Sequence, residues 1–408
     1  MKFYDVIICG GGAAGFFSAI NLAERNSNLK IAILERGKNV LEKVRISGGG
    51  RCNVMHSCFD PRELVHYYPR GEKELRGPFT MFGPTETQQW FEARGVLLKT
   101  EPDGRMFPTT DSSQTIISCF LRLSEQLGID VLCSCSVQEI KNSGAWTLST
   151  TQGNFQCDQL VIASGSSPKM WDLLQQLGHA IIPTVPSLFT FNIKDERIAE
   201  LPGVSCLATV AVTGTKLTAS GPLLITHWGM SGPAILKLSA WGARILAEKN
   251  YRFQIRVNWL HEKTTDQTLE MLQKMKADNS KKIISKSSGI LPSRLWESLV
   301  SAAKIPHDKR WADISRVELN ALAVELTAGS FTVDGKSTFK DEFVTAGGID
   351  LKEVNFKTME SKLFQNLFFA GEVLNIDAIT GGFNFQNAWT TGYLASMGIT
   401  EKNVTTTD

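Results

Sequence analysis

Three glycines near the N-terminus are spaced for binding phosphate. Gly10, Gly12 and Gly15 form a G-x-G-x-x-G pattern between an apolar run, Tyr4 to Cys9, and a helix-like run, Ala13 to about Arg25. The first glycine allows a tight turn, the second admits a pyrophosphate close to the backbone, and the third lets helix and strand pack closely. The free N–H groups of the helix start would face an anion. The segment predicts a dinucleotide-phosphate site.

An acidic residue stands where the ribose of a dinucleotide would be recognised. Glu35 ends the second expected strand, Lys30 to Glu35, and lies 20 residues after Gly15. A carboxylate there can accept hydrogen bonds from ribose hydroxyls and disfavours a 2′-phosphate. Strand, glycines, helix, strand and acid in this order predict nucleotide binding, but this pattern alone does not choose between FAD and NAD.

Glycine-rich segments recur along the chain, at 47–53, 163–167, 370–372 and 380–384. A long, extended cofactor such as FAD could touch all of them, although any single one could be an ordinary loop. The sequence shows neither the acid–base pair expected of an NAD dehydrogenase nor a second G-x-G-x-x-G. A separate NAD(P)-binding domain is therefore not expected.

The composition is that of a globular protein and excludes several classes. The chain has 408 residues, of which 42% are hydrophobic and 21% charged, enough to bury a core without metals or disulfides. Lys and Arg number 43 against 41 Asp and Glu, a formal charge of +2. No global attraction to nucleic acid or anionic lipid follows. The Lys-rich run 274–286 is interpreted as a solvated helical face.

Neither a leader, nor a membrane span, nor a metal site is predicted. No apolar run reaches the roughly 18 residues that a span needs, and no charged start precedes an apolar run and a cleavage site. The eight cysteines form no C-x-x-C pair and no cluster at zinc spacing, which favours a reduced, cytoplasmic protein. Cys133 and Cys135 lie two apart in an expected strand and would face the same side.

The order of elements predicts an α/β domain that is interrupted in sequence. Strand-like and helix-like segments alternate at the N-terminus. Residues 206–225 look like antiparallel sheet, 233–248 like one helix, and 382–397 like a final helix. The predicted domains are an FAD-binding domain at 1–188 and 341–408, a β-barrel-like module at 189–258 and 326–340, and a helical module at 259–325.

Several segments together resemble the BaiN/YhiN-type flavoproteins, a family that includes aminoacetone-oxidase-like members. The S-G-G-G-R-C-N loop and the G-G-[FY]-N-x-Q segment are far more selective than the N-terminal glycine pattern. They occur in family order and span nearly the whole chain. The matching stretches are 8–15, 46–53, 104–108, 226–233, 345–348, 369–372 and 381–386.

The resemblance implies non-covalently bound FAD in a discontinuous, glutathione-reductase-like Rossmann domain with an inserted β-barrel-like module and a helical module. The pyrophosphate would lie at Gly10, Gly12, Ala13, Ala14 and Gly15, and the adenosine ribose at Glu35. The flavin side would be lined by Lys43, Ser47, Gly48, Gly49, Gly50, Arg51, Cys52 and Asn53. The ribityl–pyrophosphate region would be near Gly371, Glu372 and Asp377, and the isoalloxazine near Gly382, Phe383, Asn384 and Gln386. The implied cofactor-binding set also includes Arg36, Val137, Ala163, Ser164 and Gly165.

Two departures from the family pattern stand out. Family members often have a longer glycine-rich stretch after the A-[ST]-G turn, whereas here Ser166 to Trp171 runs quickly into a helix. Asn375 stands where family members often have Asp. These differences concern the edge of the pocket and the tuning of the flavin rather than FAD binding itself.

Three functions are open from the sequence. The first is an FAD-dependent oxidoreductase, reduced by NAD(P)H and reoxidised by a small organic acceptor, such as one with a conjugated C=C bond. The second is a flavin amine or amino-ketone oxidase that produces hydrogen peroxide. The third is a non-catalytic flavin-bearing or RNA-associated protein, which the balanced charge disfavours. The predicted partner is a small-molecule substrate, and neither nucleic acid nor a membrane is predicted as a partner. The sequence does not set the oligomeric state.

Few side chains are candidates for proton transfer, and no catalytic residue is assigned. His227, in a glycine-rich connection between the β and helical segments, could donate a proton, with a role in loop geometry as the alternative. Cys52 follows Arg51, whose charge could lower the pKa of the thiol. We expect His66, Tyr67 and Tyr68 either to line a surface groove or to be simple packing residues.

Overall fold

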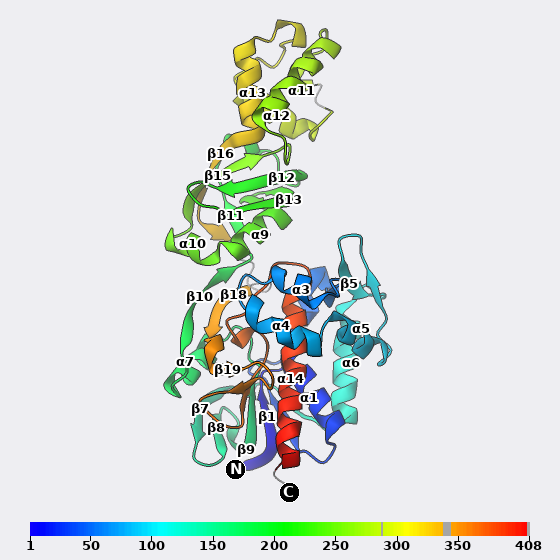
Figure 1. Ribbon diagram of the computed structural model, residues 1–408, viewed down its shortest axis with the longest axis vertical. Helices are drawn as coiled ribbons and strands as arrows, with labels where there is room; N and C mark the ends of the chain where they lie inside the picture. The colour runs from blue at the N-terminus through cyan, green and yellow to red at the C-terminus, as the bar shows by residue number, and fades with distance from the viewer. Residues whose placement is uncertain (287–288, 338–343, 406–408) are drawn as a thin grey trace. The chain divides into compact units, whose positions relative to one another are not determined.

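The computed structural model describes residues 1–286, 289–337 and 344–405. The chain divides into two compact units (Figure 1). Unit 1 comprises Met1–Val185 and Val344–Asp408, and unit 2 comprises Pro186–Phe343. Unit 1 is therefore discontinuous in sequence. The predicted domain boundary between 340 and 341 lies outside the described residues.

A parallel sheet lies at the centre of unit 1. Its strands, in order, are β21 (Leu367–Phe369), β9 (Gly153–Ile162), β1 (Lys2–Cys9), β2 (Ile31–Leu34) and β6 (Asp130–Leu132). All four residues of β2 are buried, as expected for a parallel strand covered on both faces. Two short strands, β20 (Glu360–Ser361) and β19 (Val354–Asn355), extend one edge in antiparallel pairing.

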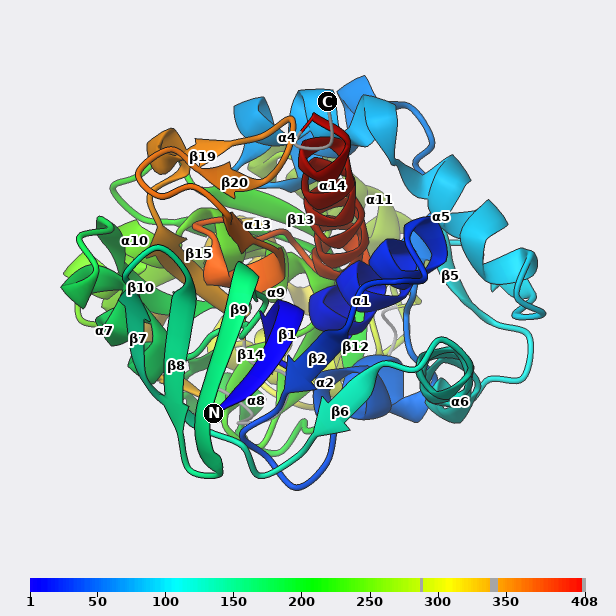
Figure 2. The same cartoon turned by 90° about the horizontal axis from the view of Figure 1, so that it is seen from below.

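Two helices lie side by side against one face of this sheet (Figures 1 and 2). They are α1 (Ala13–Arg25), which follows β1, and α14 (Phe383–Thr405). They pack closely because Gly392 has no side chain: a Cβ there would lie 2.9 Å from the Ala14 carbonyl oxygen. The Ser18 hydroxyl donates to the Gly392 carbonyl at 2.8 Å. A third helix, α6 (Ser113–Gln126), packs against α1.

An antiparallel meander continues from β9. Strands β7 (Val137–Asn142) and β8 (Trp146–Thr150) pair with each other, and β8 pairs with β9. The expected strand through Cys133 and Cys135 is wrong, because β6 ends at Leu132. The chain turns there with Ser134 at φ +55°. The N–H groups of Ser134 and Cys135 donate to the carbonyls of Gly37 and Glu35, which holds the turn against the end of β2.

The connection from β2 to α6 carries short helices and a small antiparallel sheet. The helices are α2 (Glu42–Ile46), η1 (Ser47–Gly50), α3 (Pro61–Leu64), η2 (Val65–Tyr67), α4 (Glu72–Met81) and α5 (Pro84–Glu92). The sheet consists of β3 (Met55–His56), β5 (Arg105–Pro108) and β4 (Leu98–Thr100). Further along the chain, α7 (Pro168–Gln176) follows β9, and β10 (Ile181–Ser187) pairs with β18 (Val344–Ile349).

In unit 2 a seven-stranded sheet closes on itself. Its order is β16 (Gly329–Asp334), β15 (Arg252–Asn258), β12 (Ser205–Val212), β13 (Thr218–Thr226), β14 (Gly229–Ser231), β11 (Thr190–Asn192) and β17 (Lys336–Ser337). The first and last strands of this order, β16 and β17, are consecutive pieces of one segment separated only by Gly335. The sheet therefore forms a ring, which is the β-barrel-like architecture that was expected.

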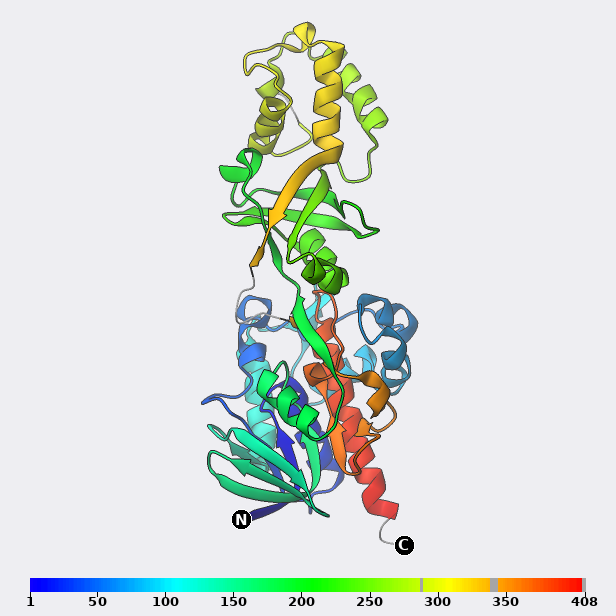
Figure 3. The same cartoon turned by 90° about the vertical axis from the view of Figure 1, so that its left-hand side faces the viewer.

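The helices of unit 2 share its core with the strands. They are α8 (Glu196–Ala199), α9 (Pro233–Trp241), α10 (Ala243–Glu248), α11 (Thr265–Asp278), α12 (Ser293–Ala302) and α13 (Arg316–Ala328), and α13 leads directly into β16 (Figure 3). Trp259 next to β15 and Trp296 on α12 belong to one buried cluster. The single helix expected at 233–248 is wrong, because the backbone leaves the helical conformation at Gly242, with φ −87° and ψ 2°, and this residue ends α9 and precedes α10. The division of the insert at 258 and 325 stays a prediction.

Candidate cofactor-binding site

Segments that are far apart in sequence meet at one edge of the sheet of unit 1. β1 runs into Gly10, β2 into Glu35, β9 into Ala163 and β21 into Ala370. Because these strands are parallel, their carboxyl ends lie on the same edge. That edge is where open α/β sheets bind ligands. The structure thus brings together four of the segments predicted from sequence.

The start of α1 is open to an anion. Its N-cap residue is Gly12, so no N-cap side chain accepts hydrogen bonds from the first N–H groups of the helix, and the first turn holds no acidic residue. A Cβ built on Gly12 would meet no atom within 4 Å, whereas one on Gly10 would lie 2.3 Å from the Ala163 carbonyl oxygen and one on Gly15 1.9 Å from the Gly10 carbonyl oxygen. Gly10 and Gly15 are therefore needed for packing, and Gly12 leaves space before uncapped N–H groups.

Glu35 fastens the glycine turn to the end of β2. One carboxylate oxygen accepts the Gly11 N–H at 2.8 Å and the other accepts the Gly37 N–H at 2.7 Å. A carboxylate offers about four acceptor positions, so capacity remains for a ribose hydroxyl. The neighbouring Arg36 is exposed. The side chain predicted to hold the ribose thus also shapes the loop predicted to hold the phosphates.

Glu372 joins two other segments beside α1. Its carboxylate accepts from the Lys43 ammonium at 2.6 Å and from the Ser166 hydroxyl at 3.2 Å. The preceding residue, Gly371, begins η6 (Gly371–Val373), and a Cβ there would lie 3.0 Å from the Ala14 Cβ. The Lys43 charge therefore faces a carboxylate.

The turn after β9 holds a polar atom that lacks a partner. The Ser164 hydroxyl oxygen is buried and makes no hydrogen bond to any described residue. Buried polar atoms are nearly always paired, so such an atom is expected where a ligand completes the site. Gly165 follows with φ +60°, and the Ser167 hydroxyl caps α7 by accepting the Met170 N–H. The short loop noted as a departure from the family pattern therefore ends in a capped helix.

The S-G-G-G-R-C-N loop follows α2 and exposes its backbone. Gly48–Gly50 have φ values between +58° and +84°, a left-handed region that favours glycine. A Cβ on Gly49 would meet nothing within 4 Å. Arg51 is already engaged, because its guanidinium donates to Glu101 at 2.6 Å and lies 4.0 Å from the centre of the Phe107 ring. The loop thus offers open backbone rather than an uncommitted cation.

The expectation of a lowered Cys52 pKa is wrong. The thiol is fully buried, and burial raises its pKa to about 12. The Arg51 charge does not reverse this effect, since that guanidinium turns toward Glu101. Cys52 instead has φ +61°, and its N–H donates to the Ser47 carbonyl at 3.0 Å. Its role in this structure is to close the loop as a neutral thiol.

Asn53 ties this loop to the start of α14. With its amide oriented by its neighbours, Asn53 donates to the Met55 carbonyl at 3.0 Å and accepts the Gly382 N–H at 3.0 Å. Gly382 has φ +91°, and a Cβ there would lie 2.5 Å from the Met55 carbonyl carbon. The Asn384 side chain accepts from the Ala378 N–H at 2.9 Å and donates to the Ala378 carbonyl at 3.1 Å. The α14 N-terminus is therefore held directly against β3.

Two residues predicted to contact the cofactor are turned into the protein. Asp377 is fully buried and accepts two hydrogen bonds from the Arg70 guanidinium. The Gln386 amide nitrogen donates to the hydroxyls of Thr87 at 2.9 Å and Thr390 at 3.1 Å. Both side chains position the segments around the start of α14. Sequence reasoning missed Arg70, whose partner is 307 residues away and whose only signal is its charge.

The remaining predicted residues lie in different settings. Val137 is buried in β7. His227 is exposed on the turn between β13 and β14 of unit 2, rather than between strand and helical segments as expected. His66 is exposed and faces Glu72 at 3.0 Å. Phe383 is buried at the start of α14.

The two helices of the site start at different heights. They run in the same direction, since Gly371 packs against both Ala14 and Ala388, and Ser18 bonds Gly392. Ala388 is the sixth residue of α14, so that helix begins about 8 Å beyond the level of Ala14, at 1.5 Å per residue. One helix start thus lies at the strand ends and the other further out on the same side. An extended dinucleotide fits these residues, with its central pyrophosphate at the start of α1 and one of its ring systems at the start of α14.

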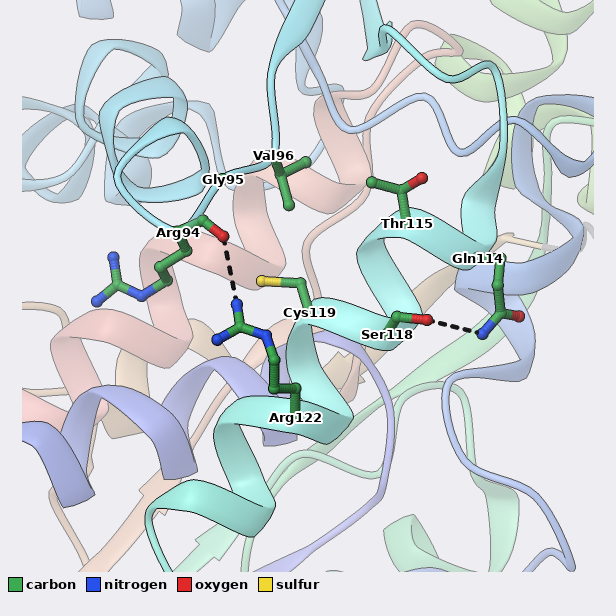
Figure 4. A pocket seen from close by; sticks show the side chains of 8 residues that line it. All are labelled: Arg94, Gly95, Val96, Gln114, Thr115, Ser118, Cys119 and Arg122. Carbon is green, nitrogen blue, oxygen red and sulfur yellow. Dashed lines mark hydrogen bonds between the residues drawn. The ribbon is translucent and has the colours of Figure 1, made fainter.

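A separate hollow of about 550 Å³ lies on the outer side of α6 (Figure 4). Its two arginines are already engaged: Arg94 pairs with Glu24 at 2.6 Å, and Arg122 donates to the Arg94 carbonyl at 3.3 Å. None of the predicted cofactor residues lines it. The lining residues are Arg94, Gly95, Val96, Gln114, Thr115, Ser118, Cys119 and Arg122.

The fold contains a Rossmann-type domain of the kind found in FAD-dependent oxidoreductases, and known structures share the fold. A 3-ketosteroid-Δ4-(5α)-dehydrogenase from Rhodococcus jostii has a TM-score of 0.52 at 12% identity, covering 98% of this chain and 97% of that one. The Escherichia coli quinol fumarate reductase FrdA has a TM-score of 0.52 at 15% identity, covering 100% and 72%. The predicted fold class is thereby confirmed.

The chain belongs to the HI0933-like family. The family description is "HI0933-like protein Rossmann domain", and the match spans residues 4–398. The chain is 26% identical to a 3-dehydro-bile acid delta(4,6)-reductase of Clostridium scindens, over 97% of this chain and 98% of the relative. It is 27% identical to a ribosomal RNA dihydrouridine synthase of Escherichia coli, over 98% of each. The family resemblance drawn from the sequence motifs is confirmed.

No helix within the described ranges has both the length and the apolar composition needed to cross a membrane.

Proposed function

We propose that this protein is a reductase that uses FAD to transfer hydrogen from NAD(P)H to a C=C bond conjugated with a carbonyl. The names of two relatives support this class. One is a bile acid reductase and the other a dihydrouridine synthase, and dihydrouridine is uridine with its ring C=C bond saturated. Two different substrates in one family thus undergo the same kind of reduction.

The observation that carries the proposal is the pair of helix starts on one side of the sheet. The space before Gly12 and the uncapped N–H groups of α1 would receive the pyrophosphate. Glu35 would bind the adenosine ribose, and the Ser164 hydroxyl would find its partner on the cofactor. The start of α14 at Gly382 would meet the isoalloxazine, which supplies hydride chemistry when bound.

In this proposal the residues of the chain bind the cofactor and orient its ring system. Asn53 and Asn384 fix the backbone around the start of α14, where the partial positive charge of the helix favours an anionic ring. NAD(P)H would act as a transient donor, since the sequence offers no second dinucleotide motif. The alternative amine or amino-ketone oxidase would use the same FAD site but take electrons from an organic substrate.

A second candidate substrate is a uridine within RNA, because two curated relatives are named ribosomal RNA dihydrouridine synthases. The near-neutral formal charge of +2 argues for a small molecule, since phosphate binding draws on clustered cations. In both candidate substrates a conjugated C=C bond is reduced. The candidates differ in whether this bond belongs to a small molecule or to a uridine of an RNA.

An anaerobic titration of the FAD-loaded protein tests this proposal. NADH and NADPH are added separately while the flavin absorbance is followed, and a 3-keto-Δ4 steroid or a uridine-containing RNA is then supplied. Bleaching by one nucleotide, followed by recovery with an acceptor, is expected. Persistent absorbance with both nucleotides, together with peroxide release from an amine in a separate assay that supplies oxygen, would overturn the reductase in favour of the oxidase.

A further inference from the structure

Three aromatic rings gather beside the start of α14. The Phe383 ring stacks with Tyr67 at 4.4 Å between ring centres and with His56 at 4.7 Å. His56 and Tyr67 are themselves 5.8 Å apart. Phe383 is buried, whereas His56 and Tyr67 are half-buried. The cluster is therefore partly accessible and directly adjoins Gly382.

The His56 ring is held in one place. His56 belongs to β3, which pairs with β5 through His56 and Arg105. A Cβ on Gly104 would lie 2.5 Å from His56 Cε1, so the ring is pressed against that backbone, which has φ +83°. Because Met55 touches Gly382 on the other side, the imidazole is fixed relative to the α14 N-terminus.

One nitrogen of the His56 ring makes a hydrogen bond within the described part of the chain, and the other does not. His56 Nε2 lies 3.2 Å from the Asp103 carbonyl oxygen. A carbonyl only accepts, so Nε2 carries the proton. Burial lowers the pKa of His56, which favours the neutral ring, and Nδ1 is then a bare acceptor. Nδ1 is buried and has no hydrogen-bond partner among the described residues.

We infer that His56 Nδ1 accepts a hydrogen bond from the imide N–H of a flat pyrimidinedione ring bound beside the Phe383 cluster. An imide N–H lies between two ring carbonyls, and a neutral imidazole nitrogen complements it. The N3–H of a flavin and the N3–H of a uracil ring have this same chemistry. The inference rests on the proposed function, since it places such a ring at the start of α14.

The neighbouring groups suit this ring type. Tyr67 and His56 present aromatic surface for stacking, which every flat heteroaromatic ring can use. Glu63 and Cys58 adjoin Tyr67 and burial raises the pKa of its phenol, so Tyr67 remains neutral. His56 would act by direct contact with the ring and would fix its orientation.

The first arm of the test uses FAD and 3-methyl-FAD, which lacks the N3–H, as probes of the full-length apoprotein. We expect the wild type to prefer FAD by about tenfold or more, the loss expected when a buried acceptor stays unpaired. His56→Ala should bring the two affinities within about twofold, and His56→Asn, which keeps an acceptor, should retain the preference. His66→Ala, an exposed histidine, is the matched control and should behave as the wild type.

The second arm repeats the comparison on the FAD-loaded protein with uridine and 3-methyluridine, followed by perturbation of the flavin absorbance. A preference for the N–H form that depends on His56 in either arm supports the inference. A preference in the first arm identifies the ring as the flavin, and a preference in the second arm identifies it as a uracil. If FAD binds but neither arm shows such a preference, the inference is overturned while the proposed function stands. If the wild type binds no FAD, both fall.

Discussion

The two ends of the proposed cofactor site are built by different means. At the start of α1 the donors are backbone N–H groups, and the site depends on the lack of a side chain at Gly10, Gly12 and Gly15. At the start of α14, by contrast, Asn53 and Met55 hold the backbone from the distant segment that leads into β3, and Asn384 ties the helix start to Ala378. The first end is local geometry, and the second is long-range packing. The two ends should therefore respond differently to substitution.

The largest effect on FAD binding is expected from Gly12→Glu. The space before Gly12 accommodates the side chain in the apoprotein, but its carboxylate would occupy and repel the phosphate position. We expect FAD affinity to fall about a hundredfold or more, which is about 2.7 kcal/mol, as measured by titration of the apoprotein. The apoprotein melting temperature should change little.

Gly12→Ala serves as the matched control for that substitution. It adds a methyl group without charge, so it should weaken FAD binding by less than Gly12→Glu does. A folded Gly12→Glu protein that keeps full flavin would refute the phosphate site.

The buried ion pair behind the α14 start should dominate stability. Asp377 is fully buried, so Asp377→Ala leaves Arg70, with only 13% of its side chain exposed, without its main partner. We expect a loss of about 3–5 kcal/mol in the free energy of unfolding, measured by urea denaturation.

Glu372→Gln offers the contrasting test at the other end of the site. Lys43, its partner, is 50% exposed, and such a pair contributes about 0–1 kcal/mol. Equal losses for Asp377→Ala and Glu372→Gln would contradict the view that the ring end depends on buried packing.

A smaller effect is expected from Gly382→Ala. The new Cβ would lie 2.5 Å from Met55, so the α14 start must move away from β3. We expect FAD affinity to fall about tenfold, seen as altered flavin absorbance and a higher dissociation constant. Gly49→Ala has the same left-handed strain, with φ +69°, but open space, and should cost only about 1 kcal/mol of stability.

The smallest effect concerns the reactivity of Cys52. Its pKa of about 12 in the folded protein keeps the reactive thiolate scarce between pH 7 and 9, by the usual behaviour of thiols. We expect iodoacetamide to leave Cys52 unmodified across this range in the native protein, as judged by peptide mass spectrometry. In urea the thiol should react with a midpoint near its ordinary pKa of about 8.5. Rapid native labelling at pH 7 would show that Cys52 is neither buried nor neutral.

The elements around the proposed phosphate end could be predicted from the sequence because their determinants are local. The spacing of three glycines and an acid already describes the turn, the helix start and the next strand end, and the structure places Glu35 on the turn itself. The alternation of strands and helices likewise predicted a discontinuous α/β fold with a barrel-like insert, which the strand order confirms.

The ring end could be predicted only in part. The motifs named Asn53, Gly382 and Asn384, but nothing in the sequence indicates that Arg70 pairs with Asp377 or that the backbone of Met55 touches Gly382. The Cys52 prediction failed because adjacency in sequence does not place a charge beside a thiol: the Arg51 side chain turns to Glu101 instead. Such contacts depend on how β3 and β5 pair.

The most direct test of a two-ended FAD site is a set of equilibrium titrations of the full-length apoprotein with FAD, ADP and riboflavin. ADP probes the α1 end alone, and riboflavin probes the α14 end alone. We predict that FAD binds at least a hundredfold more tightly than either half, because both ends act on one linked molecule. If ADP bound as tightly as FAD, the α14 end would contribute nothing and the central claim would fail.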